Sequence, residues 1–521
     1  MARPFITPAK IALTLLLLGA ALFVCSRSLE GDLQVWQAPN GRQTAPMGES
    51  GVGSSASIAL TTRLPGTTML TPTSDPPHIL PTLRSEAISY TVRSGDTLNQ
   101  IAQRYAVSPQ QVIQANQLSN PDLLEVGQVL ILPPPQPEGT APDFKIIPDS
   151  ELVYGPASAS FDIQEFIQTQ GGYLAGFQEE VNARQLTGAQ IVQKVAQEFS
   201  VNPRLLLAVL EYQSGWVTQS KPNESILEYP MQAYISWRKG LYRQLTWAAD
   251  TLNRGYYLWR VNGLAVWILA DGRVIAIAPT INAGTAGVQH LFAQLYDRAG
   301  WERAISEEGL FATYVRLFGH PFDLAVEPLL PPDLEQPPMQ LPFEKGQVWS
   351  FTGGPHGGWG DGSAWAALDF APPGEALGCV VSDAWVVAVA DGQIVRSDEG
   401  AVVQDLNVSS SAVPMDGLEQ SGWTVLYMHI ESRERVPAGR YLRAGERIGH
   451  PSCEGGFSSG THVHLARRYN GEWIPADQDL PFVLDGWVSK GTGTPYDGFL
   501  VRGGQTIEAL EGRHPENAIQ R

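Results

Sequence analysis

The chain of 521 residues has no block of basic residues, and its 35 lysines and arginines are outnumbered by 53 aspartates and glutamates. The formal net charge of −18 makes the surface acidic, whereas nucleic-acid binding depends on clustered positive charge. We therefore expect no nucleic-acid partner. Single domains usually have about 100 to 200 residues, so a chain of this length is expected to form about three.

A long hydrophobic run is also missing. The apolar stretch of residues 11–25 is shorter than the roughly 20 residues that cross a bilayer, and Arg3 and Lys10 precede it as in a secretory signal. Residues 1–28 are therefore predicted to be either a signal peptide or an uncleaved membrane anchor, which makes the protein secreted or part of the cell envelope. Cys25 invites lipidation, but the bulky Val24 before it does not suit that processing.

Cysteine is scarce, with three residues in the whole chain. Cys379 and Cys453 fall in the same C-terminal region, and two cysteines in one domain of an exported protein usually pair. We expect a disulfide between them, with two separately buried thiols as the alternative.

Serine, threonine, proline and glycine dominate residues 29–87, a composition that buries too little apolar area to offset the entropy of the chain. This segment is predicted to be a disordered linker. The compact pattern begins at residue 88, where a strand, two helices and a second strand follow one another up to residue 133.

The βααβ pattern of residues 88–133 carries the segments "YTVRSGDTLNQIAQRY", "VIQANQL" and "LEVGQVLILP". These segments resemble the LysM family. The resemblance implies a module that binds glycans containing N-acetylglucosamine, such as peptidoglycan. A small α/β domain without a ligand is the alternative.

Helical spacing of apolar residues predicts a mostly α domain over residues 145–330. Its segment "LLLAVLEYQSGW" resembles the acid-bearing helix of lysozyme-like lytic transglycosylases, whose Glu-Ser pair would fall on Gln213 and Ser214. Glutamine cannot donate a proton to the leaving glycosidic oxygen. Glu211 lies two positions earlier and points about 200° away from Gln213 around the helix, so it cannot replace it directly. We expect a non-catalytic domain that binds glycan strands or acts as a spacer. A glycosidase using Glu211 and an unrelated helical bundle remain alternatives.

Beyond a proline-rich segment, alternating apolar residues and turn signals predict an antiparallel β-sheet domain over residues 343–490, followed by a C-terminal tail of residues 491–521. The expected fold class is thus a multidomain α+β protein with a small βααβ module, a mostly α central domain and a β-sheet domain.

Four of the nine histidines lie in or beside these strands, with one aspartate: His356, His429, His462, His464 and Asp369. Side chains of a strand alternate between faces, so His462 and His464 in "THVHLA" project from the same face. A catalytic zinc commonly takes three histidine or carboxylate ligands and keeps one position for water. His356, Asp369 and one of the two neighbouring histidines would complete such a set.

The aspartate of "SAWAALDF" follows the histidine of "GGPHG" by thirteen positions. This spacing resembles the β-lytic branch of the M23 (lysostaphin/LytM-like) metallopeptidases. The resemblance implies that His356, Asp369 and His464 bind Zn²⁺ and that His429 and His462 flank the metal-bound water as catalytic residues. The better-known branch uses His-x-x-x-Asp, and the residue four positions before the aspartate is here Trp365.

Taken together, the resemblances imply a secreted or membrane-anchored peptidoglycan hydrolase. Its LysM module would bind the glycan of the wall, and its zinc endopeptidase domain would cleave the peptide. Two alternatives belong to other classes: a non-catalytic LytM-like regulator of wall hydrolases, a class that usually lacks one or more metal ligands, and a glycosidase in the helical domain.

Overall fold

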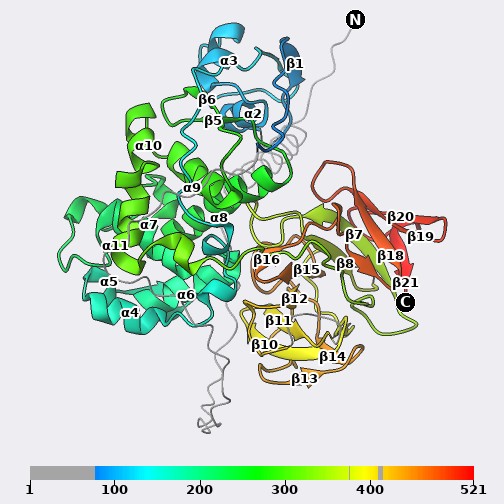
Figure 1. Ribbon diagram of the computed structural model, residues 1–521. Coiled ribbons are helices and arrows are strands. Elements are labelled where there is room, and N and C mark those ends of the chain that lie inside the picture. Colours follow the sequence, from blue (N-terminus) through cyan, green and yellow to red (C-terminus); the bar gives the residue numbers. More distant parts are fainter. Residues whose placement is uncertain (1–76, 95, 375, 409–414) are drawn as a thin grey trace, which may run out of the picture.

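The computed structural model describes residues 77–521 except 95, 375 and 409–414. The predicted signal or anchor segment of residues 1–28 and most of the predicted linker lie outside these residues. No helix among the described residues has the length and apolar character needed to span a membrane. Figure 1 shows the small N-terminal module above the helical domain, with the β-rich domain beside them.

The N-terminal module has the expected βααβ order. Its elements are β1 (Ile88–Thr91), α2 (Leu98–Arg104), α3 (Pro109–Asn116) and β2 (Val129–Leu132), with β1 antiparallel to β2. Thr97 and Ser108 begin the two helices, and each forms a reciprocal capping box with the glutamine three residues later. The module has its own small apolar core.

Helices form most of the central domain, as the sequence predicts. Gly255 in α8 (Leu241–Arg260) and Gly287 in α9 (Ala283–Ala293) let these two helices approach closely, because a Cβ on either glycine would lie within 3 Å of an atom of the other helix. The elements are α4 (Ile163–Gln170), α5 (Tyr173–Gly176), β3 (Gln178–Val181), β4 (Arg184–Thr187), α6 (Gly188–Phe199), α7 (Pro203–Ser214), α8 (Leu241–Arg260), β5 (Val266–Ile268), β6 (Val274–Ala276), α9 (Ala283–Ala293), α10 (Arg298–Ala304) and α11 (Ala312–Phe318).

The C-terminal domain is built on an antiparallel sheet, again as predicted. Its strand order is β13-β10-β11-β12-β15-β8-β7-β21, with β16 paired to β15. The strands are β7 (Val348–His356), β8 (Ala367–Ala371), β10 (Gly392–Asp398), β11 (Ala401–Leu406), β12 (Trp423–Met428), β13 (Tyr441–Leu442), β15 (Val463–Tyr469), β16 (Glu472–Trp473) and β21 (Ala518–Gln520). A short pair, β9 (Val386–Val387) and β14 (Arg447–Gly449), lies outside this sheet.

Residues 491–521 are part of this domain and not a separate tail. They provide β21, which pairs with β7, and two strands of a smaller sheet. That sheet has the order β17 (Val483–Leu484), β18 (Trp487–Gly491), β19 (Gly498–Arg502) and β20 (Gln505–Glu508). The prediction failed here because strand pairing at a sheet edge is decided by a partner far away in sequence.

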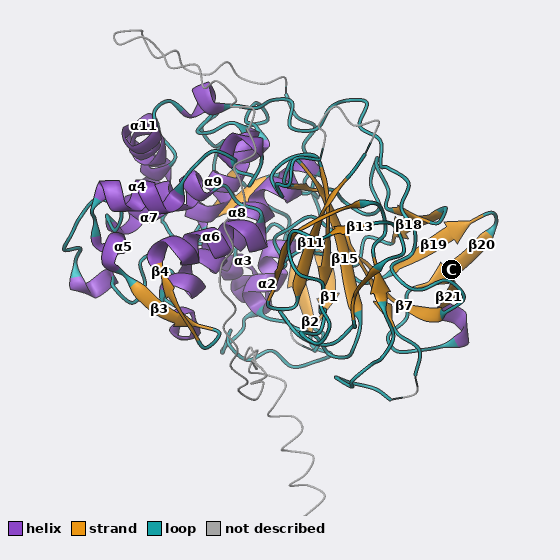
Figure 2. Ribbon diagram, turned by 90° about the horizontal axis from the view of Figure 1, so that it is seen from below, coloured by secondary structure: helices purple, strands orange, loops and turns teal. Residues whose placement is uncertain are grey.

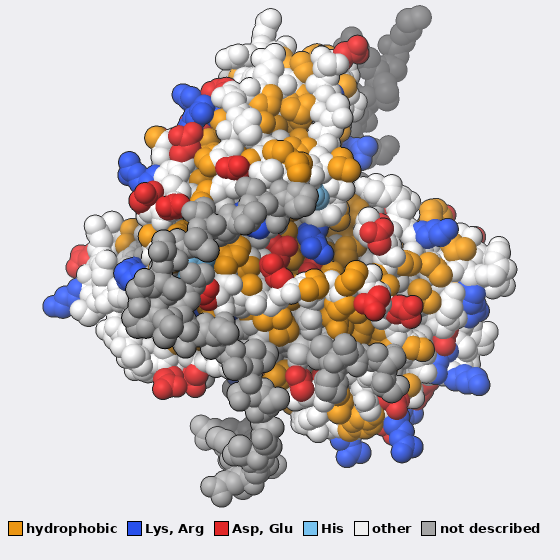
Figure 3. All heavy atoms as spheres, in the orientation of Figure 1, with side chains coloured by type: hydrophobic (Ala, Val, Ile, Leu, Met, Phe, Trp, Pro, Cys, Tyr) orange, Lys and Arg blue, Asp and Glu red, His pale blue; other side chains and the backbone are white. Residues whose placement is uncertain are grey.

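The helical domain packs directly on the main sheet (Figure 2). Ala466 on β15 and Trp473 on β16 belong to the same buried apolar cluster as the core of the helical domain. Glu472 accepts a hydrogen bond from the Tyr256 hydroxyl at 3.2 Å and pairs with Arg260 at 3.1 Å. Figure 3 shows acidic and basic side chains scattered over one face of the assembled domains, with apolar side chains between them.

Candidate metal centre

Three predicted ligand residues come from three adjacent strands of the main sheet. His356 ends β7, Asp369 lies in the middle of β8, and His464 is the second residue of β15. Asp369 and His464 are direct partners in the register of β8 and β15. Strand order thus brings together residues that are 108 positions apart in the chain, and all three side chains are buried.

The donor atoms of these residues converge on one point. Asp369 Oδ1 lies 3.3 Å from His356 Nε2 and 3.2 Å from His464 Nδ1, and the two histidine nitrogens are 3.0 Å apart. Among the described residues, this is the group of histidine, cysteine and acidic side chains whose geometry suits a metal ion.

Backbone carbonyls fix which nitrogen of each ring carries the proton. His356 Nδ1 lies 2.8 Å from the Gly354 carbonyl oxygen, and His464 Nε2 lies 3.1 Å from that of Gly358. A carbonyl only accepts, so these nitrogens are the N–H donors, and the other nitrogen of each ring presents a lone pair to the centre. This is the usual outer support of metal-binding histidines.

Two lone pairs and a carboxylate oxygen facing one another repel unless a cation lies between them. Asp369 Oδ1 is buried and forms no hydrogen bond with the described residues. Such an orphaned acceptor is costly in a protein interior, and a bound cation would satisfy it. The residues present therefore fit a metal such as zinc, which favours histidine nitrogen and carboxylate oxygen.

Without a metal, protons on the histidines can supply the positive charge instead. Burial alone would raise the pKa of Asp369, but His356 and His462 in their protonated forms outweigh it and hold that pKa well below its ordinary value. Burial alone would lower the pKa of His356, but the charge of Asp369 outweighs it and raises that pKa. Burial, and then the neighbouring His462, lower the pKa of His429 to about 3. The aspartate is thus charged and His429 is neutral at physiological pH.

His429 and His462 lie beside the three converging residues. His462 Nε2 is 3.7 Å from Asp369 Oδ1, and the rings of His429 and His462 are 4.5 Å apart between centroids. Their Nδ1 atoms face the carbonyls of Glu454 and Gly460, at 3.1 and 2.7 Å, which leaves each Nε2 free to exchange a proton. His429 follows β12 with a φ of 66°, a left-handed conformation that is unusual for a residue with a side chain.

The structure also places residues that the sequence did not single out. Tyr496, in the turn between β18 and β19, stacks on His356 with ring centroids 4.2 Å apart and an interplanar angle of 20°, while 55% of it stays exposed. It lies 140 positions from that histidine in sequence, and no local pattern links the two. Trp365, at the position that the short motif would use, is not part of the cluster.

Glu211 in the helical domain is fully engaged in local structure. Its carboxylate accepts hydrogen bonds from the backbone N–H groups of Val217 and Thr218, from the Thr218 hydroxyl and from Arg316, all within 3.0 Å. Gln213 donates to the Met231 carbonyl at 3.3 Å. Glu211 therefore fixes the chain that follows α7.

The predicted disulfide is confirmed. Cys379 and Cys453 are bonded, with Cα atoms 5.7 Å apart. The bridge joins the loop after β8 to the loop that follows β14, and Ser458 in that second loop lies 3.3 Å from His462 Nδ1. It therefore anchors the segment that leads into the two neighbouring histidines.

Comparison with known proteins agrees with this picture. Residues 90–133 match the LysM domain, and residues 145–332 match the N-terminal domain of LasA. Protease LasA from two strains of Pseudomonas aeruginosa is 26% and 25% identical over 348 and 347 residues, which cover 63% of this chain and 74% of each relative. The LysM resemblance and the relationship to a protease are thus confirmed.

Two solved structures are also similar. The M23 metalloprotease pseudoalterin, described as coming from the deep sea, is 24% identical with a TM-score of 0.27, covering 35% of this chain and 98% of its own. The catalytic domain of lysostaphin from Staphylococcus simulans is 22% identical with a TM-score of 0.17, covering 24% and 86%.

Proposed function

We propose that this homologue of Protease LasA, with a LysM domain ahead of a LasA N-terminal domain, is a zinc-dependent endopeptidase that cleaves peptide bonds of peptidoglycan. The observation that carries the proposal is the convergence of two histidine lone pairs and an orphaned carboxylate oxygen on one buried point. A zinc ion bound there would act as a Lewis acid and activate water for attack on a peptide carbonyl.

His356, Asp369 and His464 would hold the metal, each in an orientation that strand register and backbone carbonyls already fix. Three protein ligands leave one position open, as in catalytic zinc sites.

His429 and His462 would move protons and stabilise charge on the reacting carbonyl, because each keeps one nitrogen free beside the centre. The lowered pKa of His429 keeps its imidazole neutral, and its Nε2 then carries a lone pair beside the centre.

The substrate follows from the modules that accompany the site. A LysM domain binds peptidoglycan glycan, so it would hold this chain on a polymer whose peptides the C-terminal domain cleaves. We also propose that the protein acts outside the cytoplasm, secreted or in the cell envelope. The signal-like sequence of residues 1–28 and the disulfide both support an oxidising compartment.

A non-catalytic regulator is less well supported. Such regulators usually lack one or more metal ligands, whereas this chain has all three predicted ligands and both predicted catalytic histidines. A glycosidase in the helical domain is disfavoured by the engagement of Glu211.

The test separates ligands from catalysts in the full chain. The wild-type chain should bind about one zinc ion. Each ligand is removed in turn by His356→Ala, Asp369→Ala and His464→Ala. Every one of these variants should lose the zinc and should no longer digest isolated wall. His429→Ala and His462→Ala should keep zinc and slow digestion by roughly 10²-fold or more.

Trp365→Ala is the matched control, since it changes the position used by the shorter motif and should leave zinc in place. Retention of zinc by both Trp365→Ala and His356→Ala would show that the long-spacing assignment is wrong. A folded wild-type chain that binds no zinc would favour the regulator instead.

A further inference from the structure

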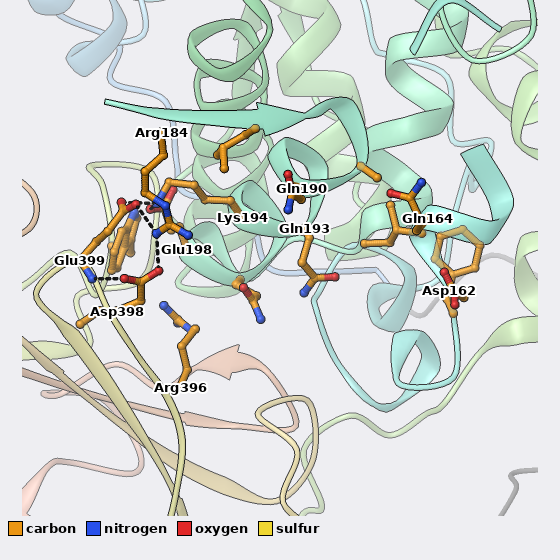
Figure 4. Close-up of a pocket in the computed structure, with 17 residues that line it drawn as sticks. Asp162, Gln164, Arg184, Gln190, Gln193, Lys194, Glu198, Arg396, Asp398 and Glu399 are labelled. Atoms are coloured by element: carbon orange, nitrogen blue, oxygen red, sulfur yellow. Dashed lines mark hydrogen bonds and ion pairs between the residues drawn. The ribbon is translucent and has the colours of Figure 1, made fainter. Parts of the chain in front are cut away.

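A cavity of about 480 Å³ lies between the helical domain and the β-sheet domain, away from the converging histidines. The helical domain contributes residues of α4, β4 and α6, and the sheet domain contributes Trp359 and the hairpin of β10 and β11. Figure 4 shows charged side chains gathered at one end, Asp162 and Gln164 at the other, and Gln190 and Gln193 between them.

One wall of this cavity is directly connected to the candidate metal centre. Trp359, which is partly buried, follows Gly358, and the Gly358 carbonyl accepts the hydrogen bond that orients His464. A molecule in the cavity would therefore touch the same glycine-rich segment that supports a metal ligand.

The charged groups at the end of the cavity are already neutralised by one another. Arg184 lies 2.7 Å from Asp398, and Lys194 lies 2.6 Å from Glu399 and 2.7 Å from Glu198. Arg396 pairs with Glu419 at 3.1 Å. No cation of the lining is left to bind a carboxylate or phosphate, so an anionic ligand would gain no charge-assisted hydrogen bond.

Uncharged hydrogen-bonding groups are abundant in the same cavity. The side-chain carboxamides of Gln164 and Gln197 form no hydrogen bond with any described residue, and the carboxamide of Gln193 uses only its N–H, donating to the Tyr154 hydroxyl at 2.9 Å. Carboxamides both donate and accept, so they suit hydroxyl and acetamido groups. Phe161, Ile163, Leu186 and Trp359 add apolar surface beside them.

From these observations we infer that the cavity binds an N-acetylhexosamine unit of a glycan strand, as a second glycan site distinct from the LysM domain. A pyranose ring offers an apolar C–H face to the aromatic and aliphatic wall, and its hydroxyl and acetamido groups match the free carboxamides. A wall stem peptide carries free carboxylates, which this lining has no unpaired cation to accept. The inference rests on the proposed function, since it assumes that the chain acts on peptidoglycan.

Two glycan sites on one chain would make binding to a continuous strand stronger than either site alone, because the second contact becomes intramolecular. The site beside Trp359 would also place the glycan next to the segment that carries His356 and Gly358. The peptide attached to that strand would then be held near the candidate metal centre.

The test is hydrogen exchange measured by mass spectrometry on the full chain, with the N-acetylglucosamine tetramer as probe. Because exchange reports each segment separately, binding by the LysM domain is read from residues 88–133 and binding in the cavity from residues 184–199 and 357–363. The tetramer should protect all three segments in the wild-type chain.

The double variant Gln164→Ala, Gln197→Ala removes two free carboxamides from exposed or half-exposed positions and should weaken protection of the cavity segments about tenfold or more. Protection of residues 88–133 should not change. The matched control is Gln185→Ala, on β4 between two lining residues but outside the lining, which should behave as wild type.

Protection confined to residues 88–133, or cavity protection that survives in the double variant, would overturn the inference. Cavity protection by a sugar-free stem peptide but not by the tetramer would overturn it as well. None of these results would change zinc content or wall digestion, so failure here is distinguishable from failure of the proposed endopeptidase.

Discussion

Gly353 faces Asp369 directly across the β7–β8 pair, and this contact makes the metal centre sensitive to a single methyl group. A Cβ at Gly353 would lie 2.7 Å from Asp369 Oδ2 and 3.0 Å from its Cβ and Cγ. The shortest of these distances is about 0.7 Å below the 3.4 Å at which ordinary contact begins. Gly353→Ala must therefore displace the carboxylate, the strand, or both.

Protein–metal distances tolerate only about 0.2 Å of variation, so a displaced Asp369 would no longer complete the site. We expect Gly353→Ala to reduce zinc affinity about 100-fold, which is the upper end of the loss seen when the outer support of a metal ligand is disturbed. Overpacking should also lower the free energy of unfolding by about 1 to 3 kcal/mol. Competition with a chelator measures the affinity, and thermal unfolding of the zinc-free protein measures the stability.

Gly460→Ala is the control within the same domain, because its Cβ would meet only Gly378 at 3.5 Å or more. It should keep wild-type zinc affinity. If Gly353→Ala bound zinc as tightly as wild type while remaining folded, Asp369 would not be a ligand held in the position that the structure shows.

Three other predictions concern different parts of the chain. Cys379→Ser opens a bridge that spans 74 residues and should lower the free energy of unfolding by about 2 to 5 kcal/mol in denaturant titrations, whereas an unchanged midpoint would contradict a structural role. Burial raises the pKa of Asp405 to about 7, so ionisation favours the unfolded state and stability falls as pH rises from about 4 to 7. Asp405→Asn should flatten that slope in thermal unfolding, and an identical slope would refute the assignment. Residues 88–133, which have their own core, should sediment with insoluble peptidoglycan as a LysM control does, and failure to do so would remove the targeting role.

The module order and most of the candidate site could be predicted from the sequence because their signals are local. The period-two alternation of a strand places His462 and His464 on one face, and the structure brings both beside Asp369. The capping residues Thr97 and Ser108 lie at the starts of the two LysM helices, where turn chemistry requires them.

The glycine-rich segment shows where local reasoning was incomplete. Gly353 has no room for a Cβ beside Asp369, and a Cβ on Gly358 would lie 2.6 Å from the ring of Trp473. These glycines are required by packing, which depends on side chains that lie far along the chain.

From the sequence alone, local patterns predicted the βααβ module and the helical and β-rich domains, and the placement of the cysteines favoured their pairing. The five residues of the candidate site were predicted through the resemblance to the M23 metallopeptidases. Only the tertiary structure decided that β21 closes the sheet edge, that Tyr496 covers His356, and that backbone carbonyls turn the histidine lone pairs toward one point. It also created the cavity between the domains. The physical reason is that alternation, caps and spacing are properties of neighbouring residues, whereas strand order and domain packing join surfaces that no local pattern connects.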